Sequence, residues 1–384
     1  MRNKGLWLAG VALLGAAVLS AQEAPLPSGS VSVNFGNTKD SPVAVKSMTS
    51  DQSRVTARGA ALVLDLKMSL TLLNTSPKRI RGITLRVVSQ EAVGGGKGSV
   101  TYPSVNVGPG DVFPAHIDMQ LVRPTQFASG PLVRVDLDGV LYDDLSFYGP
   151  DSLHSRRYLT ARELEAQRDR DYFKRVLAQG DRKALQTEIL ASMARQSETA
   201  PLSVRVVPRG PAVTSAAVPA GHTEQFAFVQ FPNAPVELLF GWAQVAGNEA
   251  RTPRIDVVNK SGKPVKSVEL GWVLSDQAGR QSAAASLPSS DPDLYLPPGK
   301  TARVLQDTTL RLFGGGGQPV NVQGMTGFLS QVEFADGKVW VPNRENLKDP
   351  LLRKSVAPSD EEMRLADIYQ KRGIDGLVEE LRKF

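Results

Sequence analysis

The sequence of 384 residues contains no cysteine, only three histidines and few aromatic residues. The absence of cysteine excludes a disulfide framework, a thiolate nucleophile, a cysteine metal site and a lipidated N-terminal cysteine. Stability must therefore come from packing. The histidines, His116, His154 and His222, lie in unrelated contexts and are not spaced as metal ligands. We therefore predict neither a metal site nor a cofactor.

Long apolar runs are also missing, apart from one at the N-terminus. Residues 6–18 are almost uniformly apolar, follow Arg2 and Lys4, and precede Ser20-Ala21. This layout is typical of a secretory signal peptide, and the run is shorter than the roughly 20 residues that a spanning helix needs. We expect residues 1–21 to be cleaved, which leaves a periplasmic or secreted protein without a transmembrane span.

The formal net charge is +6, of which Arg2 and Lys4 leave with the signal peptide. The remaining basic residues are scattered along the chain, and aromatic residues make up only 6% of it. Nucleic-acid binding proteins instead concentrate basic residues on one face or stripe. The composition therefore disfavours nucleic acid as a partner, while a mild basic bias favours anionic envelope surfaces.

The sequence contains an internal duplication. Residues 71–90 match residues 256–275, with Asn74 aligned to Asn259. Further matched pairs occur in the same order in both halves: 106–121 with 296–312, 133–142 with 330–341, and Thr160-x-x-Glu163 with Ser359-x-x-Glu362. The last pair has the capping-box signature of a helix start. Repeated order at a nearly constant offset indicates two similar units.

Each unit begins with short segments of alternating apolar and polar residues, such as ALVLDLKMSLTLLN (61–74) and VELGWVL (268–274). Gly, Pro, Asn and Ser clusters separate these segments, which is typical of strands in an antiparallel sandwich. Apolar residues at helical spacing come next in each half. We therefore predict a protein that is mainly β with α, built from two tandem antiparallel immunoglobulin-like β-sandwich units, each followed by a helical hairpin. The predicted boundaries are 1–21 for the signal peptide, 22–150 and 197–345 for the sandwiches, and 151–196 and 346–384 for the helical segments.

The Asn-x-Ser segments that begin at Asn74 and Asn259 occupy matched positions where a strand must turn. Asn is favoured in turns because its side chain hydrogen-bonds to nearby backbone. We therefore predict a turn at both positions rather than glycan attachment.

The stretch VRVDLDGVLY (133–142) resembles the catalytic loop of haloacid-dehalogenase-type phosphatases, with Asp136 and Asp138 as the carboxylate pair. That family opens a parallel α/β domain with this motif, whereas here it comes after about a hundred residues of β pattern. Asp-Gly between apolar residues is also a hairpin signature, and Asp336-Gly337 repeats it in the second half. We predict hairpin turns at both places and assign no catalytic residue.

Tryptophan offers the remaining candidates for ligand binding. Trp242, Trp272 and Trp340 lie in strand-like segments of the second half, and Tyr102 lies in the first. Aromatic residues in strands usually pack in a core. If some of these four are instead exposed in a row, they would form a platform for a carbohydrate or another polymer.

The segments 74–88 and 259–274, each followed by a Pro-Gly turn and a further strand, resemble bacterial extracytoplasmic immunoglobulin-like domains of the FxLYD type. The resemblance covers about sixty residues of each unit and does not include the helical segments. It implies a sandwich used for recognition or spacing and transfers no catalytic residue.

These observations favour an exported, non-enzymatic binding or adaptor protein whose partner is another envelope or secreted protein. Two tandem units would present duplicated contact surfaces. Two alternatives remain: a carbohydrate- or polymer-binding module, and a hydrolase or phosphatase that uses Asp136 and Asp138.

Overall fold

The computed structural model describes residues 23–27, 30–35, 40–91, 95–125, 131–198, 203–208, 221–276, 279–288, 293–305, 308–313, 318–356 and 358–384. The predicted signal peptide, residues 1–21, lies outside these ranges. Within them, no helix is long and apolar enough to cross a membrane. The chain divides into two compact units: the first comprises Met1–Pro77, Thr84–Val100 and Val107–Leu137, and the second Lys78–Ile83, Thr101–Asn106 and Asp138–Phe384.

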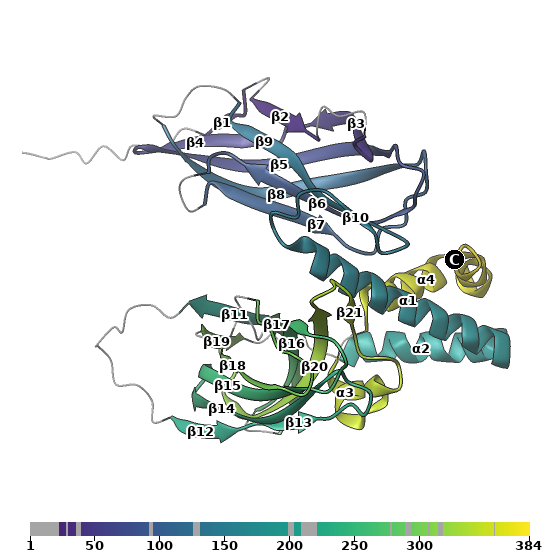
Figure 1. The fold of residues 1–384 in the computed structure, drawn as a ribbon. Helices are drawn as coiled ribbons and strands as arrows, with labels where there is room; N and C mark the ends of the chain where they lie inside the picture. Colours follow the sequence, from purple (N-terminus) through teal and green to yellow (C-terminus); the bar gives the residue numbers. More distant parts are fainter. Residues whose placement is uncertain are drawn as a thin grey trace, which may run out of the picture. The chain divides into compact units, whose positions relative to one another are not determined.

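The protein is mainly β with some α, as the sequence predicts, and the described strands form four sheets (Figure 1). The first sheet has the order β1 (Glu23–Pro25), β4 (Arg54–Arg58), β5 (Ala61–Asn74), β3 (Val43–Thr49), with β8 (Val112–Pro124) also paired to β5. The second has the order β10 (Phe147–Tyr148), β9 (Val133–Tyr142), β6 (Ile80–Val88), β7 (Lys97–Tyr102), with β2 (Val31–Asn34) paired to β9.

The other two sheets lie in the second half of the chain. The third sheet has the order β11 (Ser203–Pro208), β19 (Thr308–Phe313), β15 (Glu249–Asn259), β14 (Val236–Ala246), β12 (His222–Gln225), with β18 (Thr301–Leu305) paired to β15. The fourth has the order β13 (Ala227–Val229), β20 (Val322–Phe334), β16 (Val265–Asp276), β17 (Gln281–Pro288), with β21 (Val339–Trp340) paired to β20. The fourth sheet repeats the strand order of the second, as a duplication predicts.

The strand pairings are antiparallel except for one parallel pair in each of two sheets, so these two sheets are mixed. β2 runs parallel to β9, and β13 runs parallel to β20. In the second half the chain reaches this position by changing sheets, since β12 belongs to the third sheet and β13 to the fourth. Strands of three or four residues are too short for an alternation that reveals their partner.

The third and fourth sheets share one apolar core. Inward-facing residues of both sheets meet there, among them Val257, Leu270, Trp272 and Phe328. A second core is entirely helical: Phe173, Leu185, Ile189, Leu365, Ala366, Leu377, Val378 and Leu381 pack together. These residues come from α1 (Ser155–Gly180), α2 (Arg182–Glu198) and α4 (Asp360–Leu381). The helical segments of the two halves therefore pack against each other.

Shorter helical pieces connect the fourth sheet to α4. They are η1 (Asn346–Lys348) and α3 (Pro350–Ser355), and Leu352 of α3 belongs to the core of the two sheets. Ser359 caps α4, because its Oγ accepts a hydrogen bond from the Glu362 backbone N–H at 3.1 Å. This confirms the predicted helix start at Ser359. The matched prediction at Thr160 is wrong, since α1 begins at Ser155 and Thr160 lies inside it.

The two matched asparagines make the same turn. Asn74 is buried, donates to the carbonyls of Val107 and Gly108 at 3.1 and 3.0 Å, and accepts from the backbone N–H and hydroxyl of Ser76. Each side chain ties the end of one strand to a distant Pro-Gly turn, which confirms the predicted role in a turn.

Asn259 repeats this arrangement in the second half. It is buried, donates to the carbonyls of Lys263 and Leu296 at 2.8 and 2.9 Å, and accepts from the backbone N–H and hydroxyl of Ser261. A buried amide with all of its hydrogen bonds formed inside the protein is not accessible for modification.

The hairpin prediction holds at Asp336-Gly337 and fails at Asp138-Gly139. Gly337 has a φ of +77° in the turn between β20 and β21. Asp138 and Gly139 instead lie in the middle of β9, which continues to Tyr142. Gly139 is required there for a different reason: a Cβ atom would lie 2.3 Å from the ring of Phe147, which packs across the strand.

The first-half equivalent of Asp336 is Asp144. Asp144 comes after β9 in a turn and pairs with Lys78 at 2.7 Å, and Asp336 comes after β20 in a turn and pairs with Lys263 at 2.6 Å. Each aspartate also accepts a hydrogen bond from a backbone N–H two residues later. The duplication thus includes this turn, but shifted from the position that the Asp-Gly motif suggests.

We predict that Asn259→Ala lowers the free energy of unfolding by about 2 to 4 kcal/mol, because the carbonyls of Leu296 and Lys263 lose their donor and the bond to Leu296 is buried. The exposed Lys260→Ala, which removes only a surface pair with Glu237 at 3.1 Å, should change it by less than about 1 kcal/mol. Urea unfolding of both variants tests this, and equal losses would contradict it.

Candidate functional site

The candidate site is on the outer face of the third sheet, where β14 carries an exposed Phe240 and a partly exposed Trp242. In the sequence of β14, Phe240 and Trp242 are in phase with Val236 and Leu238, which point into the core. A β-bulge between Leu238 and Phe240 changes this phase. A bulge places two residues of one strand opposite one residue of its partner and so redirects the side chains beyond it.

Because of the bulge, Leu239 and Phe240 both point outward, and 48% and 46% of their surfaces are exposed. Trp242 and Gln244 lie further along the same outer face, while Gly241 and Ala243 point inward. Gly241 has no room for a side chain, since a Cβ atom would lie 2.8 Å from the ring of Phe226. A glycine at position 241 therefore allows the strand to pack against Phe226 while Phe240 and Trp242 face outward.

Polar side chains complete a shallow depression, which Phe240 and Trp242 line together with Thr223, Gln225 and Gln244. Gln225 pairs with Trp242 across β12 and β14, and the Gln244 amide donates to the Thr223 hydroxyl at 2.7 Å. Hydroxyl and amide groups around aromatic rings provide hydrogen-bonding capacity beside apolar surface, a combination typical of ligand-binding sites.

Arginines lie beside the depression on the same face. The Arg254 guanidinium is 5.3 Å from the centre of the Trp242 ring, within the range of a cation–π interaction. Three further arginines are held by carboxylates: Arg251 and Arg311 by Glu249, and Arg303 by Asp256. The hydrogen bond from Arg303 lowers the pKa of the Asp256 carboxyl, so this group is ionised at neutral pH.

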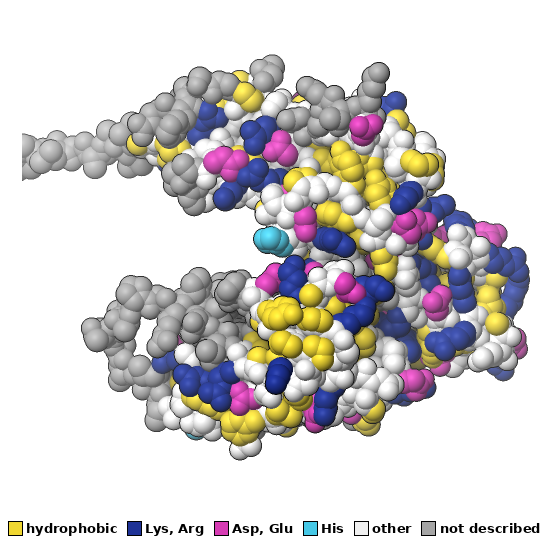
Figure 2. Space-filling view, viewed as in Figure 1, with side chains coloured by type: hydrophobic (Ala, Val, Ile, Leu, Met, Phe, Trp, Pro, Cys, Tyr) yellow, Lys and Arg dark blue, Asp and Glu magenta, His cyan; other side chains and the backbone are white. Residues whose placement is uncertain are grey.

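Figure 2 shows basic and hydrophobic side chains next to one another over β14 and β15, which Figure 1 locates. Arg251, Arg254, Arg303 and Arg311 outnumber Glu249 and Asp256, and Glu237 is neutralised by Lys260. This face is therefore aromatic and carries a net positive charge.

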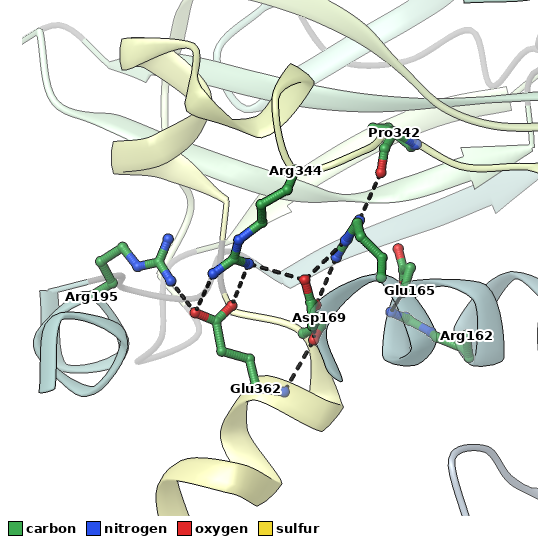
Figure 3. A network of polar contacts seen from close by, with 9 residues as sticks. Arg162, Glu165, Asp169, Arg195, Pro342, Arg344 and Glu362 are labelled. Atoms are coloured by element: carbon green, nitrogen blue, oxygen red, sulfur yellow. Dashed lines mark hydrogen bonds and ion pairs between the residues drawn. The ribbon is translucent and has the colours of Figure 1, made fainter. Parts of the chain in front are cut away.

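A second cluster of charged residues is buried among the helices (Figure 3). The Asp169 carboxylate of α1 accepts hydrogen bonds from Arg168 at 3.0 and 2.8 Å and from Arg344 at 3.0 Å. Ser359 donates to it at 2.6 Å. Its side chain has no exposed surface.

Arg344 extends this cluster to α4 and α2. Its guanidinium contacts both carboxylate oxygens of Glu362 at 3.2 Å, and Glu362 also pairs with Arg195. Burial by itself raises the pKa of the Asp169 carboxyl, but hydrogen bonds and attraction from Arg168, Arg344 and Ser359 outweigh it and lower the pKa. Asp169 is therefore a fixed anion that holds helices together, not a proton donor.

Glu163, also on α1, shows the opposite balance. It contacts Arg170 at 2.5 Å and Arg81 at 3.6 Å, yet its burial dominates and raises the pKa of its carboxyl. Arg170 and Arg81 also stack on the ring of Phe384, at 4.5 and 4.7 Å from its centre. This group, too, joins α1 to α4 and the start of β6.

The carboxylates of the phosphatase-like motif have other contacts. Asp138 is buried and accepts hydrogen bonds from the backbone N–H groups of Ser152 and Leu153 at 3.0 and 3.2 Å, and from the Ser152 hydroxyl. It fixes the loop that leads into α1. Asp136 accepts two hydrogen bonds from Arg134, at 3.0 and 2.9 Å. Both carboxylates thus have partners in the protein that account for them structurally.

The aromatic candidates from the sequence do not form a row. Trp272 is buried in the core, with its ring 4.7 Å from that of Phe226. Trp340 packs partly buried against the same core, and Tyr102 is partly buried at the end of β7. Of the four, Trp242 alone lines the depression.

Leu239, Phe240 and Arg254 were not predicted from the sequence as residues of the site. Gln244 has the same phase in the strand as the buried Val236 and Leu238 but is polar, which indicates that the alternation breaks within β14. Among the described residues, no group of three or more His, Cys, Asp and Glu side chains could hold a metal ion.

Comparisons with known proteins identify no family. No family model and no curated protein matches the chain. Among solved structures, the putative ApaA protein from Bordetella pertussis is 14% identical with a TM-score of 0.13, covering 34% of this chain and 94% of that one. Red sea bream transglutaminase is 9% identical with a TM-score of 0.13, covering 76% and 29%. A β-glucosidase from Kluyveromyces marxianus is 10% identical with a TM-score of 0.14, covering 71% and 45%.

We predict that Gly241→Ala destabilises the protein by about 1 to 3 kcal/mol, because an added methyl group overpacks the site against Phe226. Gly262→Ala is the matched control, since a Cβ atom there has nothing within 4 Å. Thermal unfolding of both variants gives the comparison, and a neutral Gly241→Ala would show that the bulge has room to relax.

Asp169→Asn should destabilise the protein by about 3 to 5 kcal/mol at pH 7, because it removes the buried carboxylate charge that Arg168 and Arg344 share. The folded pKa of Asp169 lies below the unfolded value, so its contribution is present above about pH 4 and is lost as the pH falls through the folded pKa. The loss measured by urea unfolding should therefore shrink between pH 7 and low pH.

The exposed Asp367→Asn, which breaks a surface pair with Lys371 at 2.8 Å, serves as the control for this experiment. An Asp169→Asn effect that is equally large at both pH values would contradict the assignment of a depressed pKa.

Proposed function

We propose that this protein is an exported, non-enzymatic binding or adaptor protein of the cell envelope, periplasmic or secreted after removal of residues 1–21. In this proposal its scaffold is a pair of tandem immunoglobulin-like sandwich units related to the FxLYD type. The shared core of the third and fourth sheets and the strand order common to the second and fourth sheets support that scaffold.

The observation that carries the proposal is the outward-facing group of Leu239, Phe240 and Trp242 beside Arg254. Trp and Arg are enriched among the residues that contribute most to protein–protein binding. A core strand that departs from its alternation to expose aromatic residues loses burial that would stabilise the fold. Binding of another envelope or secreted protein is the function that this arrangement supports best.

A carbohydrate- or polymer-binding function is the second candidate. It is supported by the amide and hydroxyl groups of Gln225, Gln244 and Thr223 around the same aromatic residues. The hydrolase alternative has less support, because Asp138 is occupied by backbone N–H groups at the start of a loop.

We predict that a photoreactive phenylalanine analogue in place of Phe240 cross-links to one envelope or secreted protein in intact cells. Phe240 is exposed, so the substitution is expected to leave the fold intact. The same analogue at Tyr295, which is 73% exposed away from the depression, is the matched control. Mass spectrometry identifies the proteins in the adducts. Equal labelling from both positions, or no protein adduct from position 240, would argue against the proposal.

A further inference from the structure

Arg254 is a cation on the outer face of the third sheet, and no carboxylate among the described residues pairs with it. Its side chain is exposed, and its contact is with the ring of Trp242 at 5.3 Å. The neighbouring Arg251, Arg303 and Arg311 are each held by a carboxylate of the same face. A carboxylate supplied by a ligand can therefore pair with Arg254, and a guanidinium binds a carboxylate through two parallel hydrogen bonds.

Apolar surface lies directly beside this cation. Phe240 and Leu239 are nearly half exposed, and neither can hydrogen-bond through its side chain. The register of β14 and β15 places Trp242 opposite Arg254 and Phe240 opposite Asp256. A ligand seated on this face thus meets apolar groups and an available positive charge in adjacent rows of the sheet.

This combination distinguishes a peptide from a sugar. A sugar ring stacks on a free aromatic face, but the Arg254 guanidinium already lies over the Trp242 ring. The aliphatic Leu239 also offers nothing to a hydroxyl group. A peptide in which an apolar side chain is followed closely by Asp or Glu can contact the apolar surface and pair with Arg254 at the same time.

We propose that this face, defined by Leu239, Phe240, Trp242 and Arg254, binds a segment of a partner protein that presents an apolar side chain next to a carboxylate. The inference rests on the binding function proposed above and specifies its partner. Thr223, Gln225 and Gln244 form the polar border of the site.

The test is selection of short random peptides, displayed on phage, against the full-length protein. Enriched peptides should combine an aromatic or aliphatic residue with a nearby Asp or Glu. Their affinity should fall about tenfold or more in Trp242→Ala and in Arg254→Gln, as expected for residues at the centre of an interface. Tyr295→Ala and Arg280→Gln, which alter exposed residues elsewhere, should leave the affinity unchanged.

Circular dichroism and thermal unfolding establish that each variant is folded. Arg254→Gln removes the positive charge, whereas Trp242→Ala removes the aromatic ring. Enrichment of peptides without acidic residues, no enrichment, or affinity unchanged in both variants overturns the inference. Polygalacturonate is titrated in parallel, and its binding in place of peptides would reassign the face to an anionic polysaccharide. A protein cross-linked at Phe240 despite a failed selection would preserve the binding function and reject only the acidic segment.

Discussion

The arrangement of the helices depends on the neutralisation of buried charge. Asp169 and Glu362 lie almost fully out of water, and each would be costly to bury alone. They are stabilised because Arg168, Arg195 and Arg344 converge on them from α1, α2 and the segment after β21. A buried ion pair adds little stability compared with apolar packing, but removing one partner is expensive. The network therefore selects one relative position of three helices and excludes displaced ones.

The second and fourth sheets share their strand order, but the helices of the two halves differ in their role. Asn74 and Asn259 make equivalent hydrogen bonds, and Asp144 and Asp336 make equivalent turns with a lysine. The helical segments, in contrast, contribute to a common core in which α1 and α2 pack with α4. The strands of the two halves thus keep the same local hydrogen bonds, whereas α1 and α2 of one half and α4 of the other pack into a single core.

Local features were predictable from the sequence where one residue determines them. Asn74, Asn259 and Ser359 each hydrogen-bond to backbone a few residues away, so their roles can be inferred from side-chain chemistry. Asp138-Gly139 has the same composition as a turn, but Gly139 is needed because Phe147 packs over it. That requirement depends on a strand that comes later in the chain and has no local signature.

The candidate site could not be predicted for a related reason. The bulge at Leu239 adds one residue to β14. An alternation that is extended from Val236 and Leu238 therefore assigns the residues after the bulge to the opposite face of the sheet. The pattern of β14 therefore suggested a buried Trp242. Gln244 and Gly241 contradict that phase, but only the pairing with β15 shows where the extra residue lies.

The helix that completes the charge network comes late in the chain. The hydrogen bond between Asp169 and Ser359 joins residues 190 positions apart, and Arg170 meets Glu361 across a similar interval. Contacts of such high sequence separation form slowly during folding. While the chain emerges, α1 and α2 would present the apolar residues Phe173, Leu185 and Ile189 to their surroundings. Such exposed surface makes a partly folded chain prone to aggregation, and this surface becomes buried only when α4 is available.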